Sequence, residues 1–395
     1  MGSGREVVAG LAGVAAVVSG CAVCLPLAVA ARPTTPRVCS PALPSQRPLT
    51  TVATTMVPLS GNPFGVVSTK GWSFVSTLSG QVAVLDDRGS RPRVTRELTV
   101  AGDTLAGDAL TNDGRYLLVA DGSGAVVLDV GRVEHGVPHA VLGKLAATEL
   151  TSLALDSAIE VIVSPDDRFA FVSLESANEI AVFNLDHALA TGFRRSTLVG
   201  TIPLGLAVVG MAISPDGRWL YATSEARSAT SRQGTISVMN LKLAETRPRH
   251  SLVESAAAGC DPVRVAVSPH GNVVWVAARE SNALLAFSAR RLRTDPQHAL
   301  LARVRVGAAP VGLALLHNGT RIVVADSNRF AAPGQTAALT VIDTDAALAH
   351  KAAVIGEIPA GTFPRELASD ATRHQLLVTN FGSDQLEVVN LRRLP

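Results

Sequence analysis

The sequence is poor in the residues that mark nucleic-acid-binding proteins. Aromatic residues make up only 4% of the 395 residues, and 35 basic side chains are balanced by 33 acidic ones, for a net charge of +2. A nucleic-acid groove usually combines clustered positive charge with stacking aromatic side chains. The composition therefore excludes nucleic acid as an expected partner.

Familiar catalytic motifs are also missing. The sequence contains neither a Gly-x-Ser-x-Gly elbow nor a His-Glu-x-x-His pair. Its nine histidines are scattered, and none stands in a metal-ligand spacing with cysteine or another histidine. From these absences we expect no catalytic residue, no metal site and no cofactor.

Cysteine is scarce, with four residues in the chain. Cys21 and Cys24 fall in an apolar run near the N-terminus, which leaves Cys39 and Cys260. An export route would permit a disulfide between these two. Because Cys39 lies on a proline-rich spacer, we expect two unpaired thiols, and the Cys39–Cys260 bridge is the less favoured alternative.

Residues 1–31 have the pattern of a signal peptide or a membrane anchor. Val7–Ala31 is apolar and uncharged, and Ala28-Val29-Ala30 is typical of a cleavage site. The same run is long enough to span a bilayer, and Val18-Ser19-Gly20-Cys21 resembles a lipoprotein processing site. All three interpretations predict an exported protein, either secreted or tethered to the cell membrane through this segment alone.

The five prolines of residues 32–49 predict an extended linker. Beyond the linker, one unit recurs seven times with a period of about 50 residues. Its clearest copy is AISPDGRWLYATSE at 212–225. The apolar runs are short, rich in β-branched residues and bounded by Gly, Asp and Asn, as strands are. Four strands per unit predict an all-β protein, a seven-bladed β-propeller over residues 50–391.

The Ser214-Pro215-Asp216-Gly217 segment is predicted to be the hairpin between the first and second strands of a blade. His270 and His317 occupy the same turn in other units, so we interpret them as solvated turn residues. The last unit lacks a fourth strand. Thr50–Val57 is predicted to supply it beside Gln385–Asn390, because closing the ring removes an exposed sheet edge.

The units resemble the YVTN-type β-propeller repeat, within a superfamily that includes lactonase-like seven-bladed propellers. Leu377-Val378-Thr379-Asn380 is nearly the signature of that repeat, and Thr340-Val341-Ile342-Asp343 matches its third strand. The resemblance spans roughly residues 50 to 391 and implies the propeller fold. It says little about activity, because the superfamily includes lactonases as well as cell-surface binding proteins.

Alternating strand directions place the connections between blades and the loops between second and third strands on one face, at the mouth of the central channel. We expect this face to carry the site, because loops on a rigid scaffold often do. The acidic and basic side chains predicted around the channel mouth either bind a polar ligand or pair with each other at the rim without a specific ligand. The candidate ligand-binding residues are Asp108, Glu160, Glu175, Arg264, Arg279, Asp326, Arg365, Glu366 and Asn380.

Two functions remain open. The favoured one is a non-catalytic, monomeric scaffold that binds a protein, peptide or cell-envelope ligand at the channel mouth. The alternative is a lactonase-type hydrolase similar to 6-phosphogluconolactonases or gluconolactonases, and only under this alternative is a divalent cation such as calcium expected, held by Glu160 and other carboxylates. The Pro-Arg-His element of lactonases has a look-alike at Pro248-Arg249-His250, but it stands outside a strand-one position, so no lactonase residue is carried over.

Overall fold

The computed structural model describes residues 39, 41, 43–44, 47–89, 91–100, 104–147, 157–330 and 336–395. The predicted signal or anchor segment, residues 1–31, lies outside the described residues. Within these ranges, no helix combines the length and the apolar character that crossing a membrane requires.

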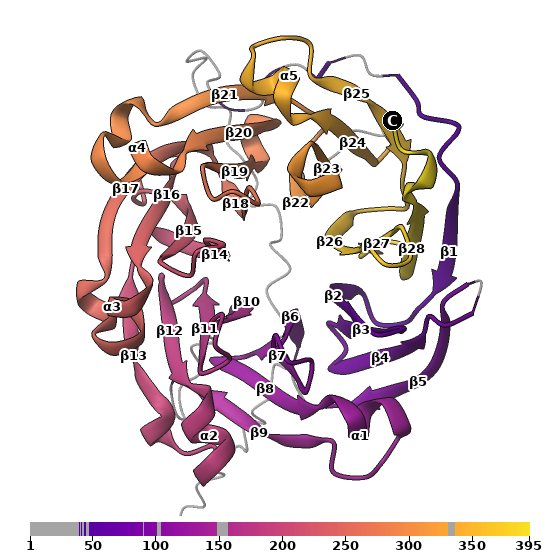
Figure 1. Cartoon of the computed structure of the whole chain (residues 1–395), viewed down its shortest axis with the longest axis vertical. Coiled ribbons are helices and arrows are strands. Elements are labelled where there is room, and N and C mark those ends of the chain that lie inside the picture. The colour runs from indigo at the N-terminus through magenta and orange to yellow at the C-terminus, as the bar shows by residue number, and fades with distance from the viewer. Residues whose placement is uncertain are drawn as a thin grey trace, which may run out of the picture. The chain divides into compact units, whose positions relative to one another are not determined.

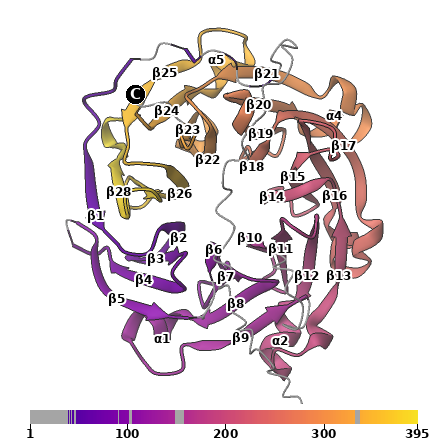
Figure 2. The same cartoon turned by 180° about the vertical axis from the view of Figure 1, so that it is seen from behind.

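The described strands form seven four-stranded antiparallel sheets, which are the blades of a propeller arranged around a central axis (Figures 1 and 2). In each blade the first strand lies innermost and the fourth lies at the outer rim (Figure 1). The predicted all-β, seven-bladed β-propeller is confirmed.

The first four blades follow one another along the chain. Blade 1 contains β2 (Pro63–Thr69), β3 (Trp72–Thr77), β4 (Gln81–Asp86) and β5 (Arg93–Thr99). Blade 2 contains β6 (Leu105–Leu110), β7 (Tyr116–Asp121), β8 (Gly124–Asp129) and β9 (Val141–Ala146). Blade 3 contains β10 (Ala158–Val163), β11 (Phe169–Leu174), β12 (Glu179–Asn184) and β13 (Leu198–Pro203). Blade 4 contains β14 (Leu206–Ile213), β15 (Trp219–Ala226), β16 (Gln233–Asn240) and β17 (Leu252–Cys260).

The remaining three blades complete the ring. Blade 5 contains β18 (Pro262–Val267), β19 (Val273–Ala278), β20 (Ala283–Ser288) and β21 (Leu300–Arg305). Blade 6 contains β22 (Pro310–Leu316), β23 (Arg321–Asp326), β24 (Ala338–Asp343) and β25 (Val354–Pro359). Blade 7 contains β26 (Pro364–Asp370), β27 (Gln375–Asn380), β28 (Gln385–Asn390) and, from the other end of the chain, β1 (Thr54–Pro58).

Five short helices follow the third strands of blades 2 to 6, a feature that strand periodicity did not predict. In each case the last residue of the strand caps the helix, because its side chain accepts a hydrogen bond from the backbone N–H three residues later. The helices are α1 (Val130–His135), α2 (Leu185–Thr191), α3 (Leu241–Thr246), α4 (Ala289–Thr294) and α5 (Thr344–Leu348).

The Ser-Pro-Asp-Gly segment is the predicted hairpin between β14 and β15. The Ser214 hydroxyl accepts a hydrogen bond from the Trp219 N–H at 2.9 Å and donates one to Asp216. Gly217 has φ of 66°, a left-handed conformation that glycine adopts without steric cost. The turn is thus held by its own side chains and is structural.

The connections between blades and the loops between second and third strands share one face, as predicted, and we call this the mouth face. The Asn178 side-chain oxygen accepts from the Ala207 N–H at 2.8 Å, and Asn282 accepts from Ala309 at 3.0 Å. In both pairs the asparagine lies in a loop between second and third strands, and the alanine precedes or begins the first strand of the next blade. These bonds fix blade 3 to blade 4 and blade 5 to blade 6.

The N-terminal strand closes the ring, as predicted. β1 pairs antiparallel with β28, with Thr54 opposite Val389 and Pro58 opposite Gln385. The strand begins at Thr54 rather than at the predicted Thr50. The delay has a physical cause, because Leu49 first donates a backbone hydrogen bond to Glu357 of blade 6 at 2.7 Å, and the chain must turn before it reaches blade 7.

Cys39 and Cys260 form a disulfide, which corrects the expectation of two unpaired thiols. Their Cα atoms lie 5.8 Å apart, within the usual range for a bridge. The expectation was wrong because it treated the proline-rich segment as a free spacer. Asn282 donates to the Pro41 carbonyl oxygen at 3.2 Å, and Pro48 forms a parallel bridge with Glu357, so the described part of this segment is bound to blades 5 and 6.

Val57 is the buried residue of the closing strand. It is 8% exposed and packs with Val75, Leu85, Leu377 and Leu386 between blades 7 and 1. Its neighbour Thr54 is exposed on the same strand. Substitutions at these two positions therefore distinguish the contribution of side-chain packing from that of backbone pairing in β1.

We predict that Val57→Asp destabilises the propeller by about 3 kcal/mol or more, because it buries an unpaired carboxylate between two blades. Thr54→Asp, the matched control, should stay within about 0.5 kcal/mol of the wild type. Chemical denaturation followed by circular dichroism measures both. Equal stability of the two variants would contradict a closing role for the strand's buried face.

The disulfide closes a loop with a sequence separation of 221 residues. We predict that Cys260→Ser lowers the free energy of unfolding by about 2–4 kcal/mol, chiefly because the unfolded chain gains freedom. Thermal unfolding with and without a reductant provides the measurement. The reductant should lower the melting temperature of the wild type and leave that of a Cys39→Ser/Cys260→Ser variant unchanged; a wild type insensitive to full reduction would show that the bridge adds no stability.

Candidate functional site

The inner strands bring equivalent residues of all seven blades together around the axis. Near its start, each inner strand has an irregular register with its neighbour, and such bulges redirect side chains. The first position within this irregular stretch forms what we call the first ring: Phe64, Ala106, Ile159, Val209, Val263, Val311 and Arg365. The next position forms the second ring: Gly65, Gly107, Glu160, Gly210, Arg264, Gly312 and Glu366.

The second ring contains four glycines and three charged residues, and space explains the pattern. A Cβ atom on Gly107 would lie 2.8 Å from the Ile159 carbonyl oxygen of the next blade. For Gly312 the corresponding distance to the Arg365 carbonyl oxygen is 2.2 Å. A side chain does not fit at these positions without a backbone shift. Glycine in the second ring of one blade thus lets the backbone of the next blade come close. In both cases that next blade carries a charged second-ring residue, Glu160 or Glu366.

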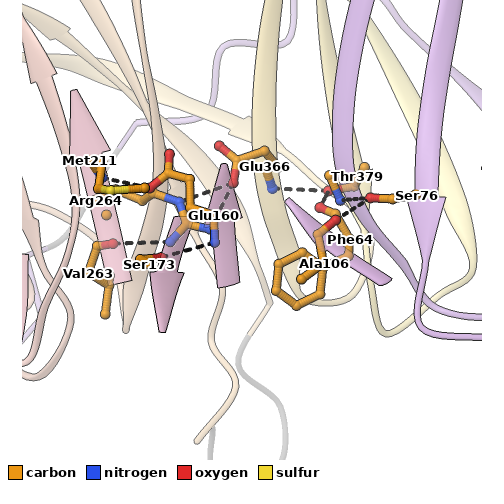
Figure 3. Close-up of polar contacts among 12 residues, drawn as sticks. Phe64, Ser76, Ala106, Glu160, Ser173, Met211, Val263, Arg264, Glu366 and Thr379 are labelled. Carbon is orange, nitrogen blue, oxygen red and sulfur yellow. Dashed lines mark hydrogen bonds and ion pairs between the residues drawn. The ribbon is translucent and has the colours of Figure 1, made fainter. Parts of the chain in front are cut away.

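Arg264 of blade 5 and Glu366 of blade 7 form an ion pair at the axis. Arg264 donates from Nε at 3.0 Å and from Nη2 at 2.9 Å to the same carboxylate oxygen of Glu366, and its Nη1 donates to the Val263 carbonyl at 3.1 Å. Figure 3 shows the two side chains reaching toward one another from separate strands. Arg264 is only 4% exposed, so its guanidinium is held in one orientation.

Glu160 of blade 3 lies beside this pair (Figure 3). Its Oε2 accepts a hydrogen bond from the Met211 N–H at 2.6 Å, and its own N–H donates to Ser173 at 3.1 Å. Burial raises the pKa of the Glu160 carboxyl from 4.5 to about 7; the positive charge of Arg264 opposes this rise and the negative charge of Glu366 adds to it. A carboxyl group in this range changes protonation near neutral pH.

Asp108 adds a third carboxyl group from blade 2, one residue beyond the second ring. It lies against Gly65 of blade 1, where an added Cβ would come within 2.4 Å of its Oδ1. Burial raises the pKa of Asp108 well above its usual range, and the nearby charge of Glu366 adds to the effect. The charge of Glu366 thus acts on Asp108 of blade 2 and on Glu160 of blade 3, and Arg264 of blade 5 opposes it at Glu160.

A second charged cluster lies on the mouth face. Arg279 contacts Glu225 at 2.9 Å and Asp261 at 3.3 Å, and Glu175 lies close enough to influence Glu225. Burial raises the pKa of Asp261 to about 6, against the opposing charge of Arg279. Of the predicted residues, Glu175 and Arg279 belong to this cluster, in which Arg279 pairs with both Glu225 and Asp261.

Arg365 lies among phenylalanines in the first ring. Its Cζ atom is 3.5 Å from the ring centre of Phe64 and 5.7 Å from those of Phe363 and Phe381. Such cation–π contacts are attractive. Burial, together with the positive charges of Arg264 and Arg329, holds the pKa of Arg365 well below its usual range.

Asp326 and Asn380 were predicted at the channel mouth, and the structure places them inside their own blades instead. Asp326 accepts a hydrogen bond from Thr340 and lies against Gly307. Asn380 donates to Glu387 at 2.9 Å. Both residues end a second strand, and there the side chain contacts the neighbouring strand of the same sheet rather than the axis.

Sequence reasoning missed Glu225, Asp261 and the phenylalanines around Arg365. Phe64 and Phe363 stand next to Pro63 and Pro364, at the start of the inner strands of adjacent blades. In a chain with only ten phenylalanines, two beside the prolines that begin adjacent inner strands were a usable signal. A search restricted to charged side chains passed over it.

A metal site at Glu160 finds no support in the donor set. Within the ranges that the structure describes, no three His, Cys, Asp or Glu side chains are grouped so that they could hold a metal ion. Arg264 also lies among the carboxyl groups at the axis, where its charge would oppose a cation. The residues present therefore do not fit the calcium ion considered under the lactonase alternative.

Comparison with known proteins agrees with the fold. Residues 160–308 match the family model described as "Lactonase, 7-bladed beta-propeller", a segment that contains Glu160, Glu175, Arg264 and Arg279 but neither Asp108 nor Glu366. No curated protein sequence matches the chain.

Solved structures show the same architecture at low sequence identity. Kuenenia stuttgartiensis hydrazine synthase superimposes with a TM-score of 0.65 at 17% identity, covering 85% of this chain and 97% of that chain. The β-propeller domain of Myceliophteria thermophila Cps50 (Swd1) superimposes with a TM-score of 0.61 at 12% identity, covering 86% and 99%. At these identities the likeness concerns the fold alone. The chain is a seven-bladed propeller that is similar, over its central blades, to the lactonase family.

The raised pKa of Glu160 has a consequence for stability. Since the folded-state pKa, about 7, exceeds the ordinary value of 4.5, the folded state binds the proton more tightly. This stabilisation is complete below about pH 4.5 and is lost as the pH rises through about 7.

We predict that Glu160→Gln makes thermal stability less dependent on pH between about 4.5 and 7, because glutamine does not titrate. The wild type should lose stability over this interval more steeply than the variant. Glu254→Gln, which alters an exposed carboxylate, serves as the control and should follow the wild type. Parallel curves for all three proteins would show that Glu160 titrates as an ordinary carboxyl group.

Proposed function

We propose that this protein is a lactonase-type hydrolase whose reaction takes place at the axis, beside the second ring. The observation that carries the proposal is the position of Glu160, a carboxyl group with a pKa of about 7, close enough to the fixed guanidinium of Arg264 to feel its charge. A general base works best when its pKa lies near the operating pH. The family match over residues 160–308 supports the same reaction class. We also propose that the repeats of this chain are of the YVTN type.

Each residue has a defined role in the proposed reaction. The Glu160 carboxylate accepts a proton from water as the water oxygen adds to the lactone carbonyl. Arg264, held by Glu366 and the Val263 carbonyl, donates a hydrogen bond to the carbonyl oxygen as negative charge develops there. The ring C–O bond then breaks, the leaving oxygen takes up the proton, and lactone plus water become one hydroxy acid.

We predict that Glu160→Gln lowers kcat/KM for lactone hydrolysis by about 100-fold or more, since the variant lacks a proton acceptor. The wild-type rate should rise with pH through about 7, because only the ionised carboxyl group acts as a base. Hydrolysis of a panel of γ- and δ-lactones, followed by proton release in the presence and absence of a chelator, provides the measurement.

The matched control for this experiment is Glu254→Gln, which alters an exposed carboxylate on the outer strand β17 and should leave the rate unchanged. Absence of turnover by the wild type with every lactone, or full activity in Glu160→Gln, would overturn the proposal.

A binding scaffold is the second candidate, and an exposed aromatic contact on the mouth face favours it. Phe330 is 65% exposed, and the Arg329 guanidinium lies 5.1 Å from its ring centre and 5.3 Å from that of Phe363. Aromatic and Arg side chains are enriched at protein–protein interfaces. Under this candidate the ligand is a protein, peptide or cell-envelope component, and the lactone panel gives no turnover.

We propose for either function that the folded body is exported and monomeric. The Cys39–Cys260 disulfide supports the first point, because disulfides form and persist mainly in oxidising compartments. The uncharged apolar run Val7–Ala31 supports it independently from the sequence.

A further inference from the structure

The first ring differs from the second in having a single charged member. Six of its seven side chains are apolar, and the seventh is Arg365. Val209, Val263 and Val311 pack together at the axis, with Ile159 and Phe363 against them. The surface around Arg365 is therefore apolar on the side of blades 3 to 6 and aromatic on the side of blades 7 and 1.

Arg365 has no anionic partner within the described part of the chain. Its Nε is buried and makes no hydrogen bond. The carboxylate whose charge influences the pKa of Arg365, Glu366, is already bound to Arg264. Arg279, which faces the same region, is bound to Glu225 and Asp261. Arg365 is thus a positive charge whose only strong contact is the face of Phe64.

An unpaired, largely buried cation is unfavourable for folding, since its desolvation is not offset by a nearby anion. Groups that lower stability in this way are commonly kept for function. An anionic ligand group would supply the missing charge. A carboxylate suits the position best, because its two oxygens match the planar fork of a guanidinium.

We propose that Arg365 binds the carboxylate of a substrate whose body is apolar: a lactone or ester with a hydrocarbon or aromatic core that carries one carboxylate. The inference rests on the proposed hydrolase function and specifies its substrate class. A polyhydroxylated body is disfavoured, because the apolar side chains of the first ring offer no hydrogen-bond partners and would leave buried hydroxyl groups unpaired.

Binding of non-reactive probes tests the proposal separately from catalysis. Calorimetry with phenylacetate, gluconate and phenylacetamide compares an apolar carboxylate, a polyhydroxylated carboxylate and an uncharged analogue. We expect phenylacetate to bind at least about tenfold more tightly than the other two. Arg365→Gln should weaken phenylacetate binding by roughly 10- to 100-fold, as expected when a charged hydrogen bond is lost.

Glu160→Gln separates this proposal from the proposed reaction. The variant should bind phenylacetate like the wild type while losing hydrolysis. If the wild type binds phenylacetate but hydrolyses no lactone, the proposed hydrolase function is wrong and the carboxylate site at Arg365 stands. If the wild type hydrolyses lactones but binds gluconate more tightly than phenylacetate, the hydrolase function stands and the proposed substrate class is wrong.

The stability of Arg365→Gln tells a ligand role from a structural one. A ligand role predicts a probe-free melting temperature equal to or above that of the wild type, since a buried unpaired charge has been removed. A structural role predicts that Arg365→Gln has a lower melting temperature than the wild type. It also predicts that Arg365→Lys binds phenylacetate as tightly as the wild type, because a positive charge alone would suffice. Either a destabilised Arg365→Gln or unchanged phenylacetate binding in that variant would overturn the proposal.

Discussion

The site depends on one constraint, the limited space where seven inner strands meet. Seven side chains do not fit at the second ring, because an added Cβ at Gly210 or Gly312 would collide with a carbonyl oxygen of the next blade. Four glycines leave room for Glu160, Arg264 and Glu366. The seven blades therefore cannot all carry the same non-glycine residue in the second ring. The blades that differ from glycine carry the charged residues of the candidate site.

Stability alone gives no reason for placing these charges there. A buried ion pair such as Arg264–Glu366 commonly contributes less to stability than apolar packing of the same volume. In the first ring, one residue earlier on the same strands, valine side chains pack together at the axis, as at Val209, Val263 and Val311. Carboxyl groups whose pKa is raised by burial, close to a fixed guanidinium, are typical of active and binding sites. The axis is the stronger candidate because the pKa of Glu160, about 7, lies nearer to neutral pH than that of Asp261 in the mouth-face cluster, about 6.

Sequence alone predicted the blade count, the hairpin turns and the closing strand, since each follows from local patterns that recur about every 50 residues. It also placed Glu160, Arg264 and Glu366 at the axis, because inner strands were recognisable in every unit. It failed where contacts join distant segments. The Cys39–Cys260 bridge depends on how the N-terminal segment crosses blade 6, and Asp326 turns into its own sheet through Thr340, a partner that no repeat pattern reveals.

Ring closure and the site are physically linked. The N-terminal segment is fixed at Cys260, the last residue of blade 4, at Asn282 in blade 5, at Glu357 in blade 6 and along β28 in blade 7 (Figure 1). Blades 5 and 7 are the ones that supply Arg264 and Glu366. Their ion pair at the axis holds its geometry only if the two blades keep their spacing, and a bound catalytic constellation loses activity with displacements of about 1 Å. The outer segment thus fixes from the rim the same pair of blades that the Arg264–Glu366 contact joins at the centre.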